Sequence, residues 1–304
     1  MQKRLALAGI PLTVLMVSAC GASDPFEEEN GETEEAGGPV VVGSADFPES
    51  SLLAELYGRA MEAEGVEVSY QLNIGSREVY YGQIEEGNLS VFPEYNGAML
   101  IHLDDQAPSG DAEETQAALE EALPKGVEVL DSSEAENKDS ITVTAETAEE
   151  HNLQSLADLA DVAEDMTLGG PPEFETRHQG VLGLQEVYGV EFSEFRSLDS
   201  TLLPPALKDD SIQAANLFTT EPQIAVEDFV VLQDPENLFG SQNVTPLINS
   251  AQVDDTAREA MNAVSAALTT EALTELNERV VVDNEDAADV AEDWLEQEGL
   301  AGDR

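Results

Sequence analysis

Three short stretches pair an aromatic side chain with small polar groups, each directly after a run typical of a buried strand. They are Ser44-Ala45-Asp46-Phe47, Glu94-Tyr95-Asn96-Gly97 and Phe218-Thr219-Thr220-Glu221. In open α/β sheets ligands bind beyond the carboxyl ends of the strands, so these stretches should lie at such edges. Aromatic faces attract organic cations, and several together enclose a quaternary ammonium group. The pattern indicates a binding site for a small cationic group, although Phe47 and Phe218 taken singly are more typical of core packing.

One basic residue is placed to complement such a site. The chain has only 12 basic residues, and Arg177 lies in a Gly/Pro-containing segment before an expected helix. A guanidinium in a loop can hold a ligand carboxylate through two parallel hydrogen bonds. A surface ion pair with Glu173 or Glu175 is the alternative that the residues leave open.

Sequence motifs of enzymes are missing from the chain. It contains no GxGxxG, no phosphate-binding GxxxxGK, no GxSxG and no HExxH. His102, His151 and His178 have no spaced carboxylate or cysteine partners, whereas zinc sites need several well-spaced donors. Carboxylates are too numerous for any pair to indicate general acid–base catalysis. We therefore expect no enzyme, and no catalytic residue, metal or cofactor.

The order of the expected elements is that of a parallel α/β sheet. Strands at 40–42, 66–72 and 89–92 alternate with helices at 49–64 and about 77–86, and this βαβαβ order is typical of a parallel sheet covered by helices. A middle block of βα units follows over about 141–232. A return strand at 244–248 precedes helices at 255–268 and 285–295, the second with Trp294 in core packing. The sequence therefore predicts two α/β lobes joined by two crossings.

The charge balance is the most unusual property of the composition. Acidic residues outnumber basic ones by 64 to 12, which gives a formal net charge of −52. Such a surface repels polyanions, so nucleic acid and anionic membrane surfaces are disfavoured as partners. High solubility alone would account for this charge, but we favour adaptation to a saline habitat, where screening weakens the self-repulsion.

The first twenty residues are typical of an export signal. Lys3 and Arg4 precede an apolar run over 5–17, and small residues follow at 18–19. This run is too short to span a bilayer comfortably. Cys20 is the only cysteine and cannot form an internal disulfide. We predict a signal peptide over residues 1–19 and a flexible, acidic tether over residues 20–39.

Several motifs resemble known families. Val17-Ser18-Ala19-Cys20 is similar to the lipobox of bacterial lipoproteins, which implies lipidation of Cys20 and anchoring to the outer face of the cell membrane. VGSADFPES, NIGSREV and FPEYNG resemble VGSKNFTEQ, NLGSREV and YPEYTG of glycine betaine/choline-type substrate-binding lipoproteins of ABC importers. The resemblance continues through EFETRHQGVLGLQEVYG and NLFTTEPQIAVEDFVVLQDPENLFG, and it covers nearly all of residues 40–300.

That resemblance implies a type II periplasmic-binding-protein-like fold, with two α/β lobes that are joined by two crossover strands and close on a ligand. It implies that Tyr95 and Phe218 are cage aromatics and that Arg177 clamps a ligand carboxylate. Two further cage tyrosines of several relatives fall at Glu78 and Asp139 in this chain. A carboxylate attracts a quaternary cation but also binds amine donors, so the identity of the solute stays open.

We therefore expect a lipid-anchored, monomeric receptor that delivers a small zwitterionic compatible solute to an ABC permease. Glycine betaine is the leading candidate for this solute, followed by choline, carnitine, proline betaine and proline. The alternatives are an amino-acid or polyamine receptor using Glu78, Asp139 and Glu221, an enzyme on a related fold, and an adhesive surface lipoprotein. Tyr95→Ala is expected to weaken binding without changing the melting temperature of the ligand-free protein.

The expected lobes are residues 40–140 with 244–304, and residues 141–243. The ligand-binding set draws on both of them: Ser44, Phe47, Glu78, Tyr95, Asp139, Arg177, Phe218, Thr219, Thr220 and Glu221.

Overall fold

The computed structural model describes residues 38–105, 107 and 110–302. The expectations for the signal peptide, for Cys20 and for nearly all of the tether therefore lie outside the described residues. Among the helices that are described, none combines the length and the hydropathy needed to cross a membrane.

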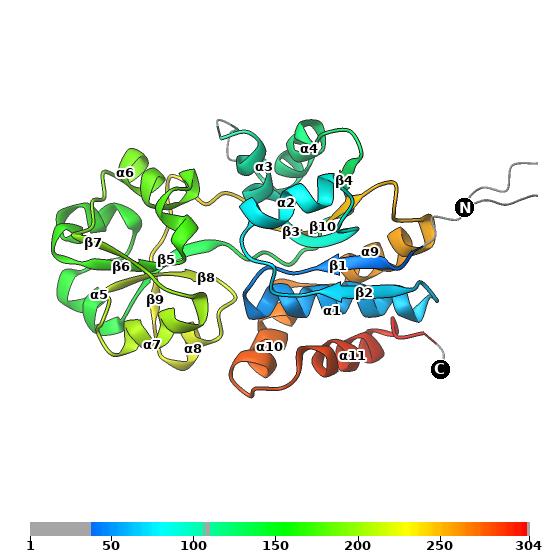
Figure 1. The fold of residues 1–304 in the computed structure, drawn as a ribbon. Coiled ribbons are helices and arrows are strands. Elements are labelled where there is room, and N and C mark those ends of the chain that lie inside the picture. Colours follow the sequence, from blue (N-terminus) through cyan, green and yellow to red (C-terminus); the bar gives the residue numbers. More distant parts are fainter. Residues whose placement is uncertain (1–37, 106, 108–109, 303–304) are drawn as a thin grey trace, which may run out of the picture. The chain divides into compact units, whose positions relative to one another are not determined.

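The first of two sheets has five strands in the order β2-β1-β3-β10-β4 (Figure 1). β1 pairs in parallel with β2 and β3, as the βαβαβ order predicts, whereas β10 runs antiparallel to β3 and β4. The bounds of these strands are Val40–Gly43 (β1), Val68–Gln71 (β2), Val91–Tyr95 (β3), Val127–Val129 (β4) and Val244–Asn249 (β10).

Helices cover both faces of this sheet. One face packs on α1, α9, α10 and α11, where Trp294 is 6% exposed and lies in the core as predicted. The other face packs on α2, α3 and α4. The helix bounds are Pro48–Ala63 (α1), Arg77–Glu85 (α2), Asn96–Leu103 (α3), Ala112–Ala122 (α4), Asp255–Ala267 (α9), Thr270–Val281 (α10) and Ala287–Glu298 (α11).

Helix α10 is absent from the elements expected from the sequence. Thr269 caps it by accepting a hydrogen bond from the backbone N–H of Ala272 at 3.2 Å, and Leu273 and Leu276 face the core. A threonine cap before an apolar stripe is a sequence signal for a helix. The omission matters because α10 carries Asn277, a residue of the site.

The second sheet repeats the arrangement of the first, in the order β7-β6-β8-β5-β9. β6 is parallel to β7 and β8, and β5 runs antiparallel to β8 and β9. Short helices and 3-10 turns cover both of its faces. The bounds are Asp139–Val143 (β5), Thr167–Gly170 (β6), Glu194–Ser197 (β7), Ala214–Phe218 (β8) and Val230–Val231 (β9), with helices Ala145–His151 (α5), Gly183–Tyr188 (α6), Leu203–Lys208 (α7) and Gln223–Val226 (α8).

Two chain segments connect the sheets, and they pair with each other where they cross. The backbone N–H of Asn137 donates to the carbonyl of Gln242 at 3.0 Å, and a bridge joins Glu136 to Asn243. The architecture is therefore two α/β lobes joined by two crossing segments, as predicted.

Strand β3 extends further than expected, because Pro93 lies inside it. The antiparallel register places Pro93 opposite Pro246, and β1 pairs with β3 only at Val91. The missing N–H of Pro93 therefore interrupts no registered pair with β1. The extension carries Tyr95 to the last position of the strand, next to the site.

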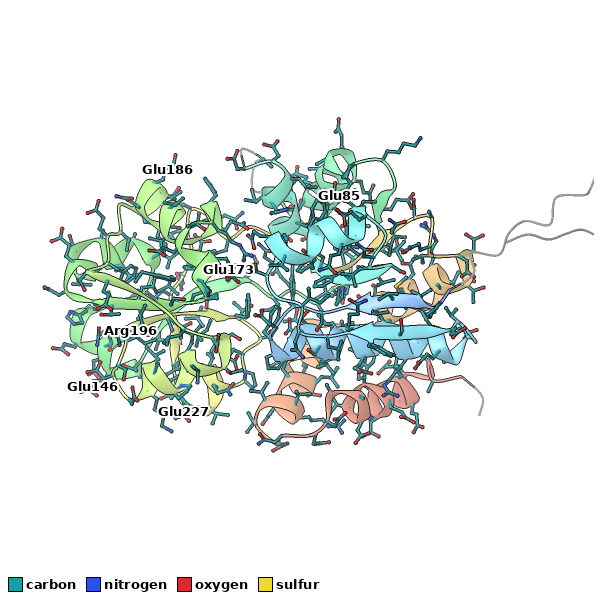
Figure 2. The ribbon with its side chains drawn as sticks, in the orientation of Figure 1. Glu85, Glu146, Glu173, Glu186, Arg196 and Glu227 are labelled. Carbon is teal, nitrogen blue, oxygen red and sulfur yellow. The ribbon has the colours of Figure 1, made fainter. Side chains whose placement is uncertain are left out.

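The acidic residues are spread over the outside of both lobes. Figure 2 shows carboxylates that project away from the ribbon, and Glu85, Glu146 and Glu186 are among the exposed ones. This placement is what the solubility and saline-habitat interpretations both require.

Candidate functional site

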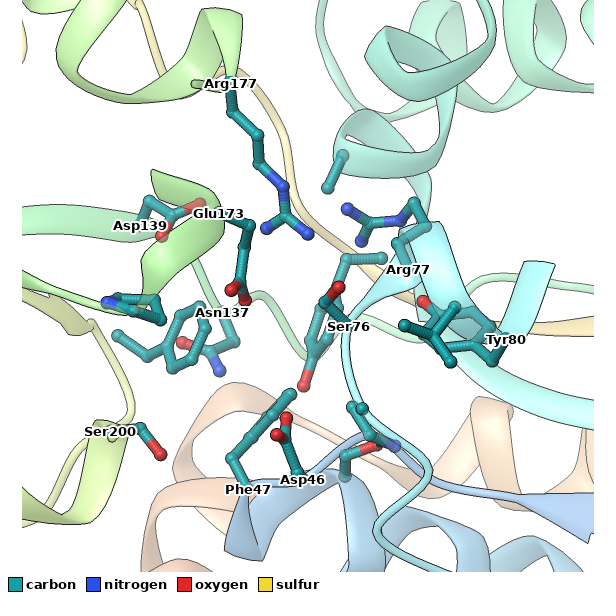
Figure 3. Close-up of a pocket in the computed structure, with 18 of the residues that line it drawn as sticks. Asp46, Phe47, Ser76, Arg77, Tyr80, Asn137, Asp139, Glu173, Arg177 and Ser200 are labelled. Carbon is teal, nitrogen blue, oxygen red and sulfur yellow. Dashed lines mark hydrogen bonds between the residues drawn. The ribbon is translucent and has the colours of Figure 1, made fainter. Parts of the chain in front are cut away.

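A cavity of about 350 Å³ lies between the lobes and is lined by side chains from both (Figure 3). Five of the predicted site residues line it. Its size is at the lower end of the range for small-molecule sites. The five residues are Phe47, Tyr95, Asp139, Arg177 and Phe218.

Three aromatic rings form one wall of this cavity. Phe47 precedes α1, whereas Tyr95 and Phe218 end β3 and β8. Phe47 lies between the other two, with its ring centroid 5.1 Å from that of Phe218 and 6.5 Å from that of Tyr95. The rings contact one another, so they make a continuous wall rather than separate sides of a cage. One aromatic residue from each of the three predicted stretches thus lines this cavity.

Tyr95 also belongs to the hydrophobic core. Its side chain is 7% exposed and contacts the cluster that packs α1 against the first sheet. Removing a buried aromatic side chain costs about 3–5 kcal/mol. Tyr95→Ala should therefore destabilise the ligand-free protein, which revises the expectation of an unchanged melting temperature.

Arg177 lines the cavity and forms an ion pair with Glu78, which lies beside the lining residues, and not with Glu173 or Glu175. Its Nε and Nη2 each donate to one carboxylate oxygen of Glu78 at 3.1 Å. Burial opposes ionisation of Glu78, but hydrogen bonds from Arg177 and Ser76 lower its pKa to about 2. Arg177 thus donates two parallel hydrogen bonds to a carboxylate of the chain, and its binding of a solute carboxylate stays a prediction.

Arg77, the other cation that lines the cavity, forms a buried pair with Glu94. Its Nε and Nη2 donate to Glu94 at 2.6 and 2.8 Å, and the Tyr80 hydroxyl donates to the same carboxylate. Burial raises the pKa of Glu94, but the Arg77 charge and the hydrogen bonds from Arg77, Tyr80 and the backbone of Tyr95 together outweigh it, and the net shift is downward. A helix amino terminus disfavours a cation. The position of Arg77 at the first residue of α2 is therefore explained by its partner Glu94, 17 residues away.

Asp139 is the one predicted acidic residue that lines the cavity without an ion pair in the described part of the chain. Asp139, in β5, lies directly opposite Phe218 of the neighbouring strand β8, and it accepts a hydrogen bond from Nδ2 of Asn216 at 2.9 Å. Burial raises the pKa of Asp139, and the hydrogen bond from Asn216 offsets only part of that rise.

Glu49, in the first turn of α1, connects the aromatic wall to both lobes. It is 5% exposed and accepts hydrogen bonds from the Tyr95 hydroxyl (2.5 Å), Asn137 Nδ2 (2.6 Å), Thr220 Oγ1 (2.5 Å) and Asn277 Nδ2. A helix amino terminus favours a carboxylate at this position. Four donors from remote segments therefore converge on one carboxylate, and we call this group the Glu49 clamp.

Thr220 and Glu221 line a second cavity of about 330 Å³ rather than the first one. Glu221 Oε1 is buried and has no hydrogen-bond partner among the described residues. Burial, together with the charge of Glu49, raises the pKa of Glu221 to about 7. The amino-acid or polyamine alternative loses support, because Glu78, Asp139 and Glu221 do not face one cavity.

The raised pKa of Glu221 predicts a pH-dependent stability. Between pH 4.5 and 7 the folded protein holds a proton on Glu221 that the unfolded chain has released, so this group's contribution to stability falls as the pH rises. Glu221→Gln removes this dependence. The difference in unfolding free energy between variant and wild type, measured with urea, should grow in favour of the variant from pH 5 to pH 8. A difference that stays constant with pH would contradict the buried position of Glu221.

Two other predicted residues lie away from the first cavity. The Ser44 side chain is fully buried, and its Oγ bonds to the Ala45 carbonyl and accepts from the backbone of Asn73 at 2.9 Å. Thr219 accepts a hydrogen bond from the backbone N–H of Lys138 at 2.9 Å. Both residues shape loops beside the site. In the described residues no group of three or more His, Cys, Asp or Glu side chains is arranged to hold a metal.

Known proteins resemble this chain over most of its length. Residues 38–297 match the OpuAC family, described as the substrate binding domain of ABC-type glycine betaine transport system. The chain belongs to this family. It is 26% identical over 281 residues to the glycine betaine-binding protein YehZ of Escherichia coli K12, an alignment that covers 87% of this chain and 92% of that protein.

Other members agree with this assignment. The chain is 25% identical over 278 residues to the glycine-betaine-binding protein of Pseudomonas aeruginosa, covering 86% of this chain and 88% of that one. Its fold matches the crystal structure of a glycine betaine/carnitine/choline ABC transporter protein with a TM-score of 0.69 and 22% identity, over 86% of this chain and 99% of that one. The predicted type II periplasmic-binding-like fold is thereby confirmed.

Proposed function

We propose that this chain is the solute receptor of an ABC importer and that its solute is a small quaternary ammonium compound, with glycine betaine first. One observation carries the proposal: the inter-lobe cavity has an aromatic wall of Phe47, Tyr95 and Phe218 and a guanidinium from Arg177. Aromatic faces attract quaternary ammonium groups, and a guanidinium binds carboxylates. The names of the relatives from E. coli and P. aeruginosa support the same solute.

Isothermal titration calorimetry tests this proposal against glycine betaine, choline, carnitine, proline betaine and proline, with amino acids and a polyamine as the second arm. We expect at least one quaternary ammonium compound to bind more tightly than about 1 mM. Binding of primary amines alone would favour the amino-acid or polyamine alternative. If no compound binds or raises the melting temperature, the adhesive lipoprotein becomes the better hypothesis.

The remaining features complete this proposal. We propose that the chain is a binding protein rather than an enzyme. Turnover of a bound solute would contradict this. It acts as a monomer outside the cell, held by lipid on Cys20 and working with an ABC permease. Its lobes comprise about residues 40–140 with 244–304, and about residues 141–243, with the first boundary moved ahead of Asp139 because β5 belongs to the second sheet. Incorporation of labelled fatty acid into the wild type but not into Cys20→Ser checks the anchor.

A further inference from the structure

The guanidinium of Arg177 already has a partner within the chain. Its side edge, Nε and Nη2, faces both oxygens of Glu78, each at 3.1 Å. This is the parallel two-bond geometry by which arginine recognises carboxylates. Glu78 therefore makes the same contact that the carboxylate of a zwitterionic solute would make.

Glu78 and Arg177 come from opposite sides of the cavity. Glu78 lies in the first turn of α2, which covers the first sheet, and Arg177 lies beyond β6 of the second sheet. Arg177 lines the cavity, and the side chains of the pair are 30% (Arg177) and 46% (Glu78) exposed. A pair so accessible to water is weak and exchangeable, unlike a buried one. An incoming carboxylate can therefore displace Glu78.

No second cation is available to a solute carboxylate. Arg77 is the only other Lys or Arg lining the cavity in the described residues, and Glu94 binds it through two hydrogen bonds of 2.6 and 2.8 Å. Further carboxylates line the cavity without an ion pair in the described part of the chain. These are Asp46, Asp139, Glu173 and Asp199, of which Figure 3 labels Asp46, Asp139 and Glu173.

We propose that Glu78 is an internal competitor for Arg177 and sets the preference of the receptor between two kinds of quaternary ammonium solute. A solute that carries a carboxylate must displace Glu78 or share a guanidinium whose charge Glu78 already offsets. A solute without a carboxylate leaves the pair intact and gains from the negative cavity. This inference rests on the proposed function and adds the specificity-determining residue.

Glycine betaine and choline are the matched pair that tests this inference, because they share the trimethylammonium head and differ in a carboxylate against a hydroxyl. Glu78→Gln keeps the size of the side chain and one acceptor for Arg177, but removes the charge. We expect the affinity for glycine betaine to rise about three- to ten-fold, because the solute no longer has to break a partly exposed ion pair, and such pairs are weak. The affinity for choline should change less than about two-fold or fall.

Asp199→Asn is the matched control. It removes one negative charge from the lining of the cavity, beside which Glu78 lies, without releasing Arg177, so the ratio of betaine to choline affinity should rise by less than half as much as in Glu78→Gln. Thermal melts check that both variants stay folded, which the exposure of the Glu78–Arg177 pair leads us to expect.

The outcomes separate this inference from the proposed function. If the wild type binds both solutes and Glu78→Gln leaves their ratio unchanged, or weakens both equally, Glu78 is not a competitor and the inference fails alone. If neither solute binds to wild type or variant, the proposed function fails as well. Binding of glycine betaine only to the variant would support the inference in its strongest form.

Discussion

Arg77→Met is expected to lower the free energy of unfolding by about 3–5 kcal/mol at neutral pH, the cost of leaving a buried charge without its partner. Glu94 is fully buried and Arg77 is 8% exposed. Within the described part of the chain, the variant leaves Glu94 with the Tyr80 hydroxyl and the backbone N–H of Tyr95 as its hydrogen-bond donors, the latter at 2.7 Å. Urea-induced unfolding measures the loss.

Two controls separate this charge effect from lost packing. Adding Glu94→Gln to Arg77→Met removes the uncompensated charge, so the double variant should recover more than half of the loss. Arg258→Met makes the same change at an exposed pair, Arg258–Glu128 at 2.8 Å, and should cost less than about 1 kcal/mol. Equal losses at both sites would contradict a strong buried pair.

The pH dependence of this effect has a definite sign. The folded pKa of Glu94 lies below its ordinary value of 4.5, mainly because Arg77 opposes the effect of burial. The stability that the pair supplies is present above pH 4.5 and is lost as the pH falls through the folded pKa. The deficit of Arg77→Met should therefore shrink as the pH is lowered below about 4.5, as the carboxyl becomes neutral.

Glu49→Gln is expected to weaken solute binding at least about ten-fold and to lower the free energy of unfolding by about 2–4 kcal/mol. The carboxylate accepts from four donors, whereas an amide turns its own N–H groups toward two of them. Oε1 accepts from Tyr95 and Asn137, and Oε2 accepts from Thr220 and Asn277, so the amide nitrogen faces one of these two pairs. Either Tyr95 loses the bond at 2.5 Å that fixes its ring in the wall, or Thr220 loses its bond of 2.5 Å across the lobes. Calorimetry and urea unfolding measure the two effects.

Thr220→Val distinguishes positioning from a general loss of stability. Thr220 does not line the first cavity, so its removal can affect binding only through the Glu49 clamp. We expect Thr220→Val alone to weaken binding a few-fold, as loss of one hydrogen bond to a charged group. In the Glu49→Gln background the same change should have little further effect. Additive losses in binding would mean that the clamp does not act as a unit.

The elements of the fold could largely be predicted because their signals are local. Val40 to Val42 read as a buried strand, and the predicted parallel pairing with β2 and β3 is present. The structure differs from the prediction at two places. A proline is typical of a strand end, but β3 continues through Pro93, which lies opposite Pro246. Helix α10 begins after the capping residue Thr269, a signal separate from the apolar periodicity on which the predicted helices rest.

The residue pattern alone predicts that Tyr95 and Phe218 follow buried strands, where ligands bind in α/β sheets. Phe218 lies on the second sheet, whereas Phe47 and Tyr95 lie with the first, so their meeting at one cavity depends on how the lobes pack. The partner of each charge depends on that packing as well. Arg177 pairs with Glu78 across 99 residues, Arg77 with Glu94 across 17, and Glu49 collects donors as far away as Asn277, 228 residues on. Hydrogen bonds and close ion pairs depend on distances of a few ångströms, and packing sets those distances. In a chain with 64 acidic residues, spacing along the sequence does not identify the partner of an arginine.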